Sequence, residues 1–429
     1  MSVLNMGADA VNKLFLEYIM PGLNTEIRAN SVLYDRFETD IDHVVGKYAV
    51  FKCLTSSAKS ARPSSSTTFP TAKQGVYNEF IIYMKRGLYA SLQFDNLAVA
   101  CSQGKGAVMD VLEAELSGIK IHIANKMNRQ FWGDGSGKLA QVMGAVSASP
   151  TVPVDSPIFG TSASAYTNPS NYLDEGQEVD FINPTTGLVE EEAVEISSID
   201  IAGAGHDHLT MSRACTISDN AWVFDHDTMA SSQAAGTGVP MGLRGIIATT
   251  DPYTGITETS FQNVDRDTYS WARAQSTTMG GAVAAVTNAK ILEAIMNQEK
   301  YGRTSVILSN DILWRCFYTI LEQDKTMPND PAFWGGLTGL TFYGGRAGKI
   351  PWIYDSDAPD ETLHFLDDSL LKVFSPVKNG MAWLPGDNGI LTRVSGKDEW
   401  AANLAYYYNF GTAKPLGLNK LINVKHAAS

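Results

Sequence analysis

Histidine and aspartate occur together at two places in the chain, and both residue types bind metal ions. His206, Asp207 and His208 are consecutive, and His226 and Asp227 follow at the end of a later strand-like run. Imidazole and carboxylate ligands suit zinc and related transition metals. If the two strands pair, these side chains meet at one edge of a β unit, so His206, His208 and His226 are candidate metal ligands. An exposed turn that collects His and Asp because they are well solvated is the alternative.

Two glycine-rich stretches are similar to catalytic loops but lack required positions. In "GGRAGKIP", residues 344–351, the position five before Gly348 is Tyr343, and Ile350 stands where a phosphate-binding loop has Ser or Thr. "GDGSG", residues 133–137, does not have the Gly-x-Ser-x-Gly spacing of a hydrolase nucleophile elbow. We therefore expect turns at both places.

The remaining polar clusters also favour solvated turns over chemistry. "DSDAPDE", Asp355 to Glu361, offers oxygen ligands but not the spacing or the glycine of a calcium loop. No Ser/His/Asp or Cys/His set stands out, although triad partners need not be close in sequence. We expect no enzyme and no cofactor, with a hydrolase built from dispersed residues as an alternative.

The cysteines and the first residues indicate where the protein is made. No CxxC pair occurs, so free thiols in a reducing cytoplasm are a better interpretation than a disulfide framework or a zinc site. Asp9 and Glu17 interrupt the apolar core that a signal peptide needs, and no apolar run reaches the ~18 residues of a spanning helix. The four cysteines are Cys53, Cys101, Cys215 and Cys316.

Composition and charge limit the class of partner. The chain has 429 residues, 44% of them hydrophobic and 18% charged, which is typical of two or three globular units. Its formal net charge is −13, whereas proteins that coat nucleic acid or anionic membranes are usually basic. Tight nucleic-acid or membrane binding is therefore not expected. Many polar positions are Ser, Thr, Asn and Gly, which favours surfaces that become buried between subunits.

A basic, Ser/Thr-rich stretch, Thr55 to Gly75, lies between two strand-like runs, Val44–Leu54 and Val76–Leu88. We predict a long hairpin with this stretch at its tip. The second strand has apolar residues on both faces, and an isolated two-stranded ribbon is only marginally stable in water. Contact with other subunits would cover both faces. The alternative is that these strands are central in a larger sheet of their own domain.

Periodicity predicts the other elements. Apolar residues recur at three- and four-residue steps over Lys105–Trp132, which predicts a long helix of about 42 Å. Further helices are expected at Ala289–Tyr301 and after Asn310, a good N-cap. Composition changes after Gly144 to a Pro/Ser/Thr-rich linker. Short strand-like runs follow from Tyr172 to Asp227, which indicates a small, acidic, inserted β unit.

The order of these parts resembles the major capsid protein of tailed bacteriophages with the HK97-type fold. Two segments carry the most specific likeness, "LTFYGGRAGKIPWIYDSDAPDETLHFLDDSLLKVF" and "GILTRVSGKDEWAANLAYYYNFGTAKPLGLNKLINV". The first has a strand, a glycine turn, an extended pair near a proline, a D-x-D-x-P turn and a strand ending in Asp-Asp. The second resembles the closing strands of that family.

The resemblance implies an α+β fold in which an N-terminal arm, an extended hairpin loop and a spine helix join peripheral and axial domains, with a small all-β insertion. The corresponding segments are the arm at 1–43, the extended loop at 44–92, the peripheral domain with the spine helix at 93–145, the linker-flanked insertion at 146–236, a peripheral return at 237–288, the axial domain at 289–384 and C-terminal peripheral strands at 385–429.

The resemblance also implies a function without catalysis. The chain would assemble with itself into pentamers and hexamers around phage double-stranded DNA, in the virion, after synthesis in the cytoplasm of a bacterial host. A separate scaffolding protein, a portal and decoration proteins would be its partners. As a hypothesis, Lys59, Arg62 and Lys73 make salt-sensitive contacts with acidic neighbouring subunits. Lys59 and Lys73 also lie where some family members carry a crosslinking lysine, but no catalytic Glu or acceptor Asn can be matched.

Two other functions are compatible with the sequence. An encapsulin-type compartment would share the fold but enclose a cargo enzyme, and the content of purified particles would separate the two. From a different class, the β insertion with His206, His208 and aromatic residues is compatible with a carbohydrate-binding adhesin. Such a protein would remain a small oligomer in sedimentation.

Overall fold

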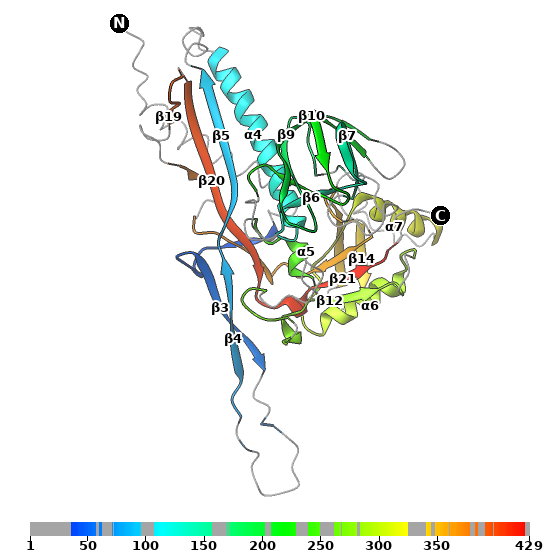
Figure 1. Ribbon diagram of the computed structural model, residues 1–429. Helices are drawn as coiled ribbons and strands as arrows, with labels where there is room; N and C mark the ends of the chain where they lie inside the picture. Colours follow the sequence, from blue (N-terminus) through cyan, green and yellow to red (C-terminus); the bar gives the residue numbers. More distant parts are fainter. Residues whose placement is uncertain are drawn as a thin grey trace, which may run out of the picture. The chain divides into compact units, whose positions relative to one another are not determined.

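The computed structural model has mixed α and β secondary structure in two compact units (Figure 1). The first unit contains the described residues of 1–41, 84–242 and 375–410, and the second contains those of 42–83, 243–374 and 411–429. Among the helices described, none combines the length and apolar character needed to cross a bilayer. The described residues are 36–56, 60–61, 71, 73–95, 107–156, 170, 172–201, 207–228, 239–248, 261–266, 268–280, 284–324, 340–344, 348–359, 361–377, 382–384, 391–397 and 399–424.

Helix α4, Ala107–Trp132, belongs to the first unit and has 26 residues, which corresponds to about 39 Å. It begins two residues after the predicted start. Ile123, Met127 and Phe131 are each 2–3% exposed, as their three- and four-residue spacing predicts. Residues 1–35 of the expected N-terminal arm lie outside the described residues.

Two long strands form the sheet next to α4. Strand β5, Lys85–Asp95, pairs antiparallel with β20, Glu399–Thr412, from Asp95–Glu399 to Lys85–Tyr408. The short strands β18, Ala382–Trp383, and β19, Leu391–Arg393, pair with the other edge of β20. β1, Glu38–Asp40, also belongs to this unit.

Gly87 of β5 allows this strand to approach β20 closely at Tyr408. A Cβ atom at Gly87 would lie 2.1 Å from the ring of Tyr408, so a larger residue does not fit there. The carbonyl of Gly87 accepts a 2.9 Å hydrogen bond from the Gln130 side chain of α4. The same Gln130 side chain accepts a hydrogen bond from the Tyr408 hydroxyl. The long helix is thereby tied to both strands.

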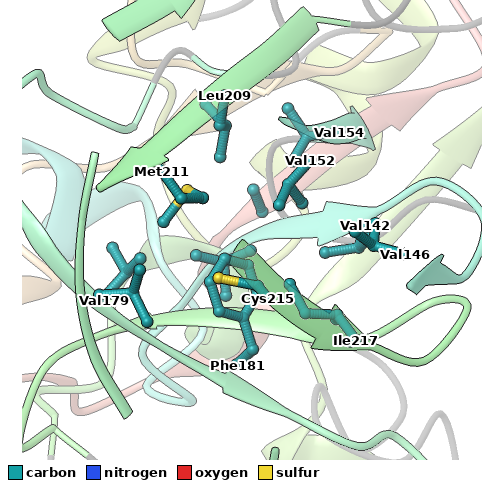
Figure 2. Close-up of a cluster of buried hydrophobic side chains, with 14 of the residues drawn as sticks. Val142, Val146, Val152, Val154, Val179, Phe181, Leu209, Met211, Cys215 and Ile217 are labelled. Atoms are coloured by element: carbon teal, nitrogen blue, oxygen red, sulfur yellow. The ribbon is translucent and has the colours of Figure 1, made fainter. Parts of the chain in front are cut away.

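Six strands of the first unit close into a barrel in the order β10-β7-β6-β11-β8-β9. Closure leaves no free strand edge, and the alternating apolar side chains fill the interior (Figure 2). Val152, Val154, Val179 and Phe181 are completely buried there. The strands are β6 Lys138–Val142, β7 Val146–Ser156, β8 Glu178–Ile182, β9 Val189–Asp200, β10 Asp207–Ile217 and β11 Trp222–Asp225.

The barrel is larger than the predicted β unit, and the linker prediction for residues 146–156 is wrong. That stretch forms β7, because Val146, Val152 and Val154 point into the barrel core despite two prolines. Pro150 lies where the register between β7 and β10 shifts, a bulge at which the missing N–H group is tolerated. The Ser, Thr and Pro content of this stretch is typical of a linker, and it hid the spacing of the valines that would have predicted a strand.

Two ion pairs fix the barrel to α4. The Lys126 ammonium is 2.8 Å from a carboxylate oxygen of Asp225, at the end of β11. Arg129 donates to both carboxylate oxygens of Asp174, at 2.6 and 3.0 Å, and to the Tyr172 carbonyl at 3.2 Å. Burial alone would raise the pKa of Asp174, but the hydrogen bonds and charge of Arg129 outweigh it and lower the pKa.

The second unit is built on a six-stranded sheet of order β12-β21-β16-β13-β15-β14. β12 pairs parallel with β21, β13 pairs parallel with β15, and the other neighbours are antiparallel. The strands are β12 Gln275–Thr278, β13 Val306–Ser309, β14 Leu340–Gly344, β15 Gly348–Tyr354, β16 Leu363–Leu366 and β21 Asn419–Ile422. The unit also contains strand β17, Leu371–Phe374, and the short helices α5 Leu243–Ile246, η3 Ser270–Ala272 and η4 Pro415–Gly417.

Two helices pack on one face of this sheet. They are α6, Asn288–Glu299, and α7, Asp311–Asp324, close to their predicted positions. The Asn310 side chain accepts hydrogen bonds from the N–H groups of Ile312 and Leu313, at 2.8 and 3.1 Å, as expected of an N-cap. The core beneath them includes Phe317 stacked on Trp352, with ring centroids 4.5 Å apart.

The segment 385–429 was expected to form strands of a single domain, but its strands are divided between the two units. In 385–429, most of β20 lies in the first unit with β5, whereas β21 lies in the second unit between β12 and β16. Strand β12, from the expected peripheral return at 237–288, joins the same sheet as the strands of 289–384. Short strands carry too little sequence pattern to show which sheet they enter.

Candidate assembly surface

The predicted hairpin is present in the second unit as a three-stranded sheet of order β2-β3-β4 (Figure 1). β3, Tyr48–Ser56, and β4, Val76–Tyr83, pair antiparallel from Tyr48–Tyr83 to Ser56–Val76. The predicted first strand, Val44–Leu54, is interrupted. Val44–Val45 forms β2 and folds back on β3 through a two-residue turn whose Gly46 has φ 66°.

One face of the hairpin is covered by its own unit. Phe80 is completely buried and Ile82 is 2% exposed. The Phe80 ring lies 5.5 Å from that of Trp271 and 5.4 Å from that of Phe51. Val264, from a loop far along the chain, packs in the same cluster. This face therefore needs no second copy of the chain.

The opposite face is aromatic and exposed. Side chains alternate along a strand, so Tyr77 and Tyr83 share this face with Tyr48, the cross-strand partner of Tyr83. Tyr77 is 67% exposed, Tyr83 55% and Tyr48 41%, and the rings of Tyr48 and Tyr83 meet edge to face at 6.4 Å. Between them, Lys52 and Glu79 form an exposed 3.9 Å ion pair, a kind of contact that contributes little to stability.

These observations correct the interpretation of the hairpin. We expected both apolar faces to need neighbouring subunits, but the Phe80 and Ile82 face is covered within the chain. The alternative, that the strands are central in a larger sheet, does not hold for β4, which has β3 as its only strand partner among the described residues. The end of the predicted second strand, Lys85–Leu88, instead belongs to β5 and pairs with β20. Trp271 and Val264 were missed as covering residues because they lie nearly 200 positions away, where no local pattern marks them.

The basic residues of the tip are only partly within the described chain. Lys73 is exposed just before β4. Lys59 and Arg62 lie outside the described residues. Their salt-sensitive contacts with a neighbouring copy stay a prediction, as does the crosslinking role considered for Lys59 and Lys73.

The candidate metal ligands do not have the strand pairing that the hypothesis required. His208 lies on β10, which pairs with β7 and β9, whereas His226 follows β11, which pairs with β6 and β8. His206 is outside the described residues. Within the described ranges, no group of three or more His, Cys, Asp or Glu side chains is placed to hold a metal ion.

His226 instead forms an ion pair with a buried carboxylate. Its Nδ1 is 2.9 Å from a carboxylate oxygen of Asp180, a side chain that is 4% exposed. The hydrogen bond to Asp180, followed by the attraction of that charge, raises the pKa of His226. The Asp180 carboxylate also accepts the N–H groups of Ala193 at 2.8 Å and Asp227 at 3.2 Å, two residues with φ of 51° and 59°. Asp180 therefore holds strained backbone at the barrel rim.

Two of the weak loop motifs lie at the ends of strands or in a local turn. Gly344 and Gly348 end two antiparallel strands, β14 and β15, and a phosphate-binding loop would instead join a strand to a helix. In the acidic "DSDAPDE" segment, Asp355 is buried and accepts the N–H of Asp357 at 2.9 Å, which is a local turn. Both arrangements agree with the turns expected from the sequence.

The carbohydrate-binding alternative gains no support from the barrel surface. The exposed large apolar side chains recorded on the described barrel and its turns are aliphatic: Met143, Leu188 and Ile201. Trp222 is partly buried under the Lys138 ammonium, 3.9 Å from the ring centroid. Sugar-binding proteins use exposed aromatic faces, and none of these three side chains is aromatic.

No family model matches the sequence. No curated protein matches it either.

Several solved structures are similar to this chain over most of its length. The capsid asymmetric unit of cyanophage A-1(L) is 12% identical, with a TM-score of 0.48, and the likeness covers 94% of this chain and 93% of that one. The procapsid of satellite phage P4 is 8% identical with a TM-score of 0.44, covering 94% and 90%. An encapsulin complex from Synechococcus elongatus is 9% identical with a TM-score of 0.38, covering 82% and 79%. At these values, function has to be argued from the chain itself.

Proposed function

We propose that this chain is the major shell protein of a tailed-bacteriophage head. Copies of it assemble into pentamers and hexamers, and these close into an icosahedral shell around double-stranded DNA. The protein has no catalytic role in this proposal. It is made in the cytoplasm of a bacterial host and ends in the virion.

The exposed aromatic face of the hairpin is the observation that carries the proposal. Tyr48, Tyr77 and Tyr83 present their rings to solvent from a ribbon whose other face is already buried. Tyrosine provides a large apolar contact with little loss of side-chain entropy, and contiguous exposed apolar patches mark interaction sites. A second copy of the chain is the occupant that a self-assembling shell supplies.

Charge supports the same proposal. The net charge of −13 leaves the surface of each copy acidic overall, so a basic hairpin tip finds complementary charge on a neighbour. An acidic lining also holds packaged DNA only loosely, because tight binding depends on basic residues that release counterions from phosphates. Many modest contacts in a closed symmetric assembly then add up through multivalency.

The remaining roles follow from the resemblance. The segment 1–43 acts as an N-terminal arm, 44–92 as the extended loop, and α4 as the spine of a peripheral domain. The segment 289–384 acts as an axial domain near the five- and sixfold axes. The barrel is the insertion, and a separate scaffolding protein, a portal and decoration proteins are the partners.

Electron microscopy of the expressed chain, alone and with a scaffolding protein from the same source, tests the proposal. The expected result is closed icosahedral particles, together with rapid sedimentation. A chain that stays a compact monomer or small oligomer under all these conditions contradicts it. Particles filled with a protein cargo and free of nucleic acid would replace the phage head by an encapsulin-type compartment.

A further inference from the structure

The ladder between β5 and β20 has one irregularity, close to the start of β5. The residues on either side of Gly87 are opposite consecutive residues of β20, Tyr406 and Tyr407, so Gly87 is an extra residue in β5. A bulge of this kind leaves the extra residue out of the ladder and bends the strand. The chain enters the first unit at Met84, so the bulge lies three residues from this point.

The side chain of Gln130 replaces the pairing that the bulge interrupts. Its amide nitrogen donates to the Gly87 carbonyl at 2.9 Å, and its amide oxygen accepts the hydroxyl of Tyr408 from β20. A backbone carbonyl buried without a hydrogen bond costs free energy, so the contact with Gln130 stabilises the bulge. Because both ends of one amide group are used, a displacement of Gln130 breaks both hydrogen bonds together.

The last turn of α4, which carries Gln130, also contacts the chain where it leaves the first unit. Gly242 is the last residue of the segment 84–242. A Cβ atom at this position would lie 2.3–2.5 Å from the carbonyl oxygens of Gln130, Phe131 and Gly133. The chain therefore passes directly against the carbonyl end of the helix, and a larger residue at Gly242 does not fit unless that turn moves.

A second exit of the chain from the first unit contacts the same turn. Phe410 is the last residue of the segment 375–410, and its ring packs edge to face on that of Phe131, with centroids 5.1 Å apart. The side chain of Asn409 accepts the Met241 N–H at 2.8 Å, which joins the two exits to each other. One helical turn therefore contacts both exits and also holds the bulge of β5.

We propose that the last turn of α4 couples the start of β5 to the two exits at Gly242 and Phe410. When the chain shifts at either exit, the turn moves, Gln130 loses its hydrogen bonds, and Lys85–Gly87 separates from β20. Closely packed elements change between discrete arrangements instead of deforming gradually, so the release occurs in one step. The coupling is reciprocal, because release of the bulge also loosens both exits. It is a property of the single subunit and does not depend on the shell-forming role.

Hydrogen–deuterium exchange of the full-length subunit, measured by mass spectrometry, tests the coupling. Gly242→Ala displaces the helix carbonyls and should speed exchange of the Lys85–Leu88 amides about tenfold or more, because local opening exposes them. Exchange of Ser91–Asp95, farther along the same strand, should stay unchanged. Gly144→Ala is the matched control. It strains a barrel turn of the same unit, at φ 76° with no atom within 4 Å of the added Cβ, and should leave the Lys85–Leu88 rates unchanged.

Gln130→Met removes the hydrogen bonds directly and should speed exchange of the same amides by a similar factor. Its control is Gln93→Met, the same change at the far end of the ladder, where the Gln93 side chain donates to Glu399 of β20. Unchanged Lys85–Leu88 rates in Gly242→Ala or in Gln130→Met overturn the proposal. So does faster exchange along the whole of β5, which would show general destabilisation. If Gly242→Ala does not fold, Phe410→Leu, which removes the ring contact at the other exit, takes its place with the same expected result.

Discussion

The barrel and the hairpin are both antiparallel β structures, but they use their apolar side chains in opposite ways. In the barrel, Val179 and Phe181 are completely buried, and every strand pairs on both sides. In the hairpin, Tyr77 and Tyr83 are 67% and 55% exposed, and one edge of β4 has no partner strand among the described residues.

The difference indicates which region depends on other copies of the chain. A closed barrel has no free edges and buries its apolar side chains in one molecule. A two-stranded ribbon is marginal by itself and gains stability when its second face is covered. We infer that the barrel is complete within a single subunit, whereas the hairpin is completed by assembly.

Removing the aromatic face of the hairpin should have the largest effect. The triple variant Tyr48→Ser, Tyr77→Ser, Tyr83→Ser should abolish particles while the subunit remains folded, because exposed side chains contribute little to the stability of the monomer. Sedimentation velocity and electron microscopy measure assembly, and circular dichroism measures folding. Leu188→Ser, at a 58% exposed residue of the barrel, is the control and should assemble normally. Normal particles from the triple variant would remove the basis of the proposed function.

Reversing the charge of the hairpin tip should come next. Lys59→Glu, Arg62→Glu and Lys73→Glu together should block assembly of a folded subunit, since acidic tips repel acidic neighbours. Assembly of the wild type should weaken with added salt, because the Debye length is only about 10 Å at 0.1 M. Light scattering against salt concentration measures both effects. Reversing three exposed lysines elsewhere, at Lys300, Lys397 and Lys414, is the control, and equal inhibition there would show a general charge effect.

A cavity in the barrel should lower the unfolding free energy of the subunit, and it should not act directly on the contacts between subunits. Phe181→Ala removes a completely buried ring and should cost about 3–5 kcal/mol of unfolding free energy. Urea unfolding of the subunit, followed by tryptophan fluorescence, measures the loss. Leu188→Ala should change stability by less than about 0.5 kcal/mol. A loss below about 1 kcal/mol for Phe181→Ala would mean that the barrel interior is less tightly packed than described.

The smallest effect concerns pH at the barrel rim. The pKa of His226 is raised above its ordinary 6.5 by Asp180, so the folded state binds the proton more tightly than the unfolded state. The stabilisation is fully present below pH 6.5 and is lost as the pH rises through the folded pKa. The difference in unfolding free energy between wild type and His226→Gln should shrink over this range. A difference that does not vary with pH would contradict the ion pair.

Local periodicity predicted the parts of the fold that a single segment determines. The apolar steps of α4, the Asn310 cap of α7 and the pairing of β3 with β4 could all be read from neighbouring residues. The turn at Gly46 was missed because the apolar run hides it, although a glycine between two valine-rich stretches is a recognisable hairpin signal.

Contacts between distant segments could not be predicted in the same way. No pattern near Phe80 in the sequence predicts that Trp271 covers it. The hairpin was therefore expected to need neighbouring subunits on both faces. The strand pairing that the metal hypothesis required was mispredicted for a related reason. His208 and His226 lie close in sequence, but the closed barrel order places two other strands between β10 and β11.

The division of the chain between its two units has a consequence for synthesis on the ribosome. Each unit is assembled from three separate segments, so the first needs residues up to 410 and the second needs β21 before its sheet is complete. The barrel, in contrast, is one continuous run from Lys138 to Asp225. Its strands pair only with one another, so no later segment is needed to close it, and we infer that it is the natural place to exchange or tag a segment.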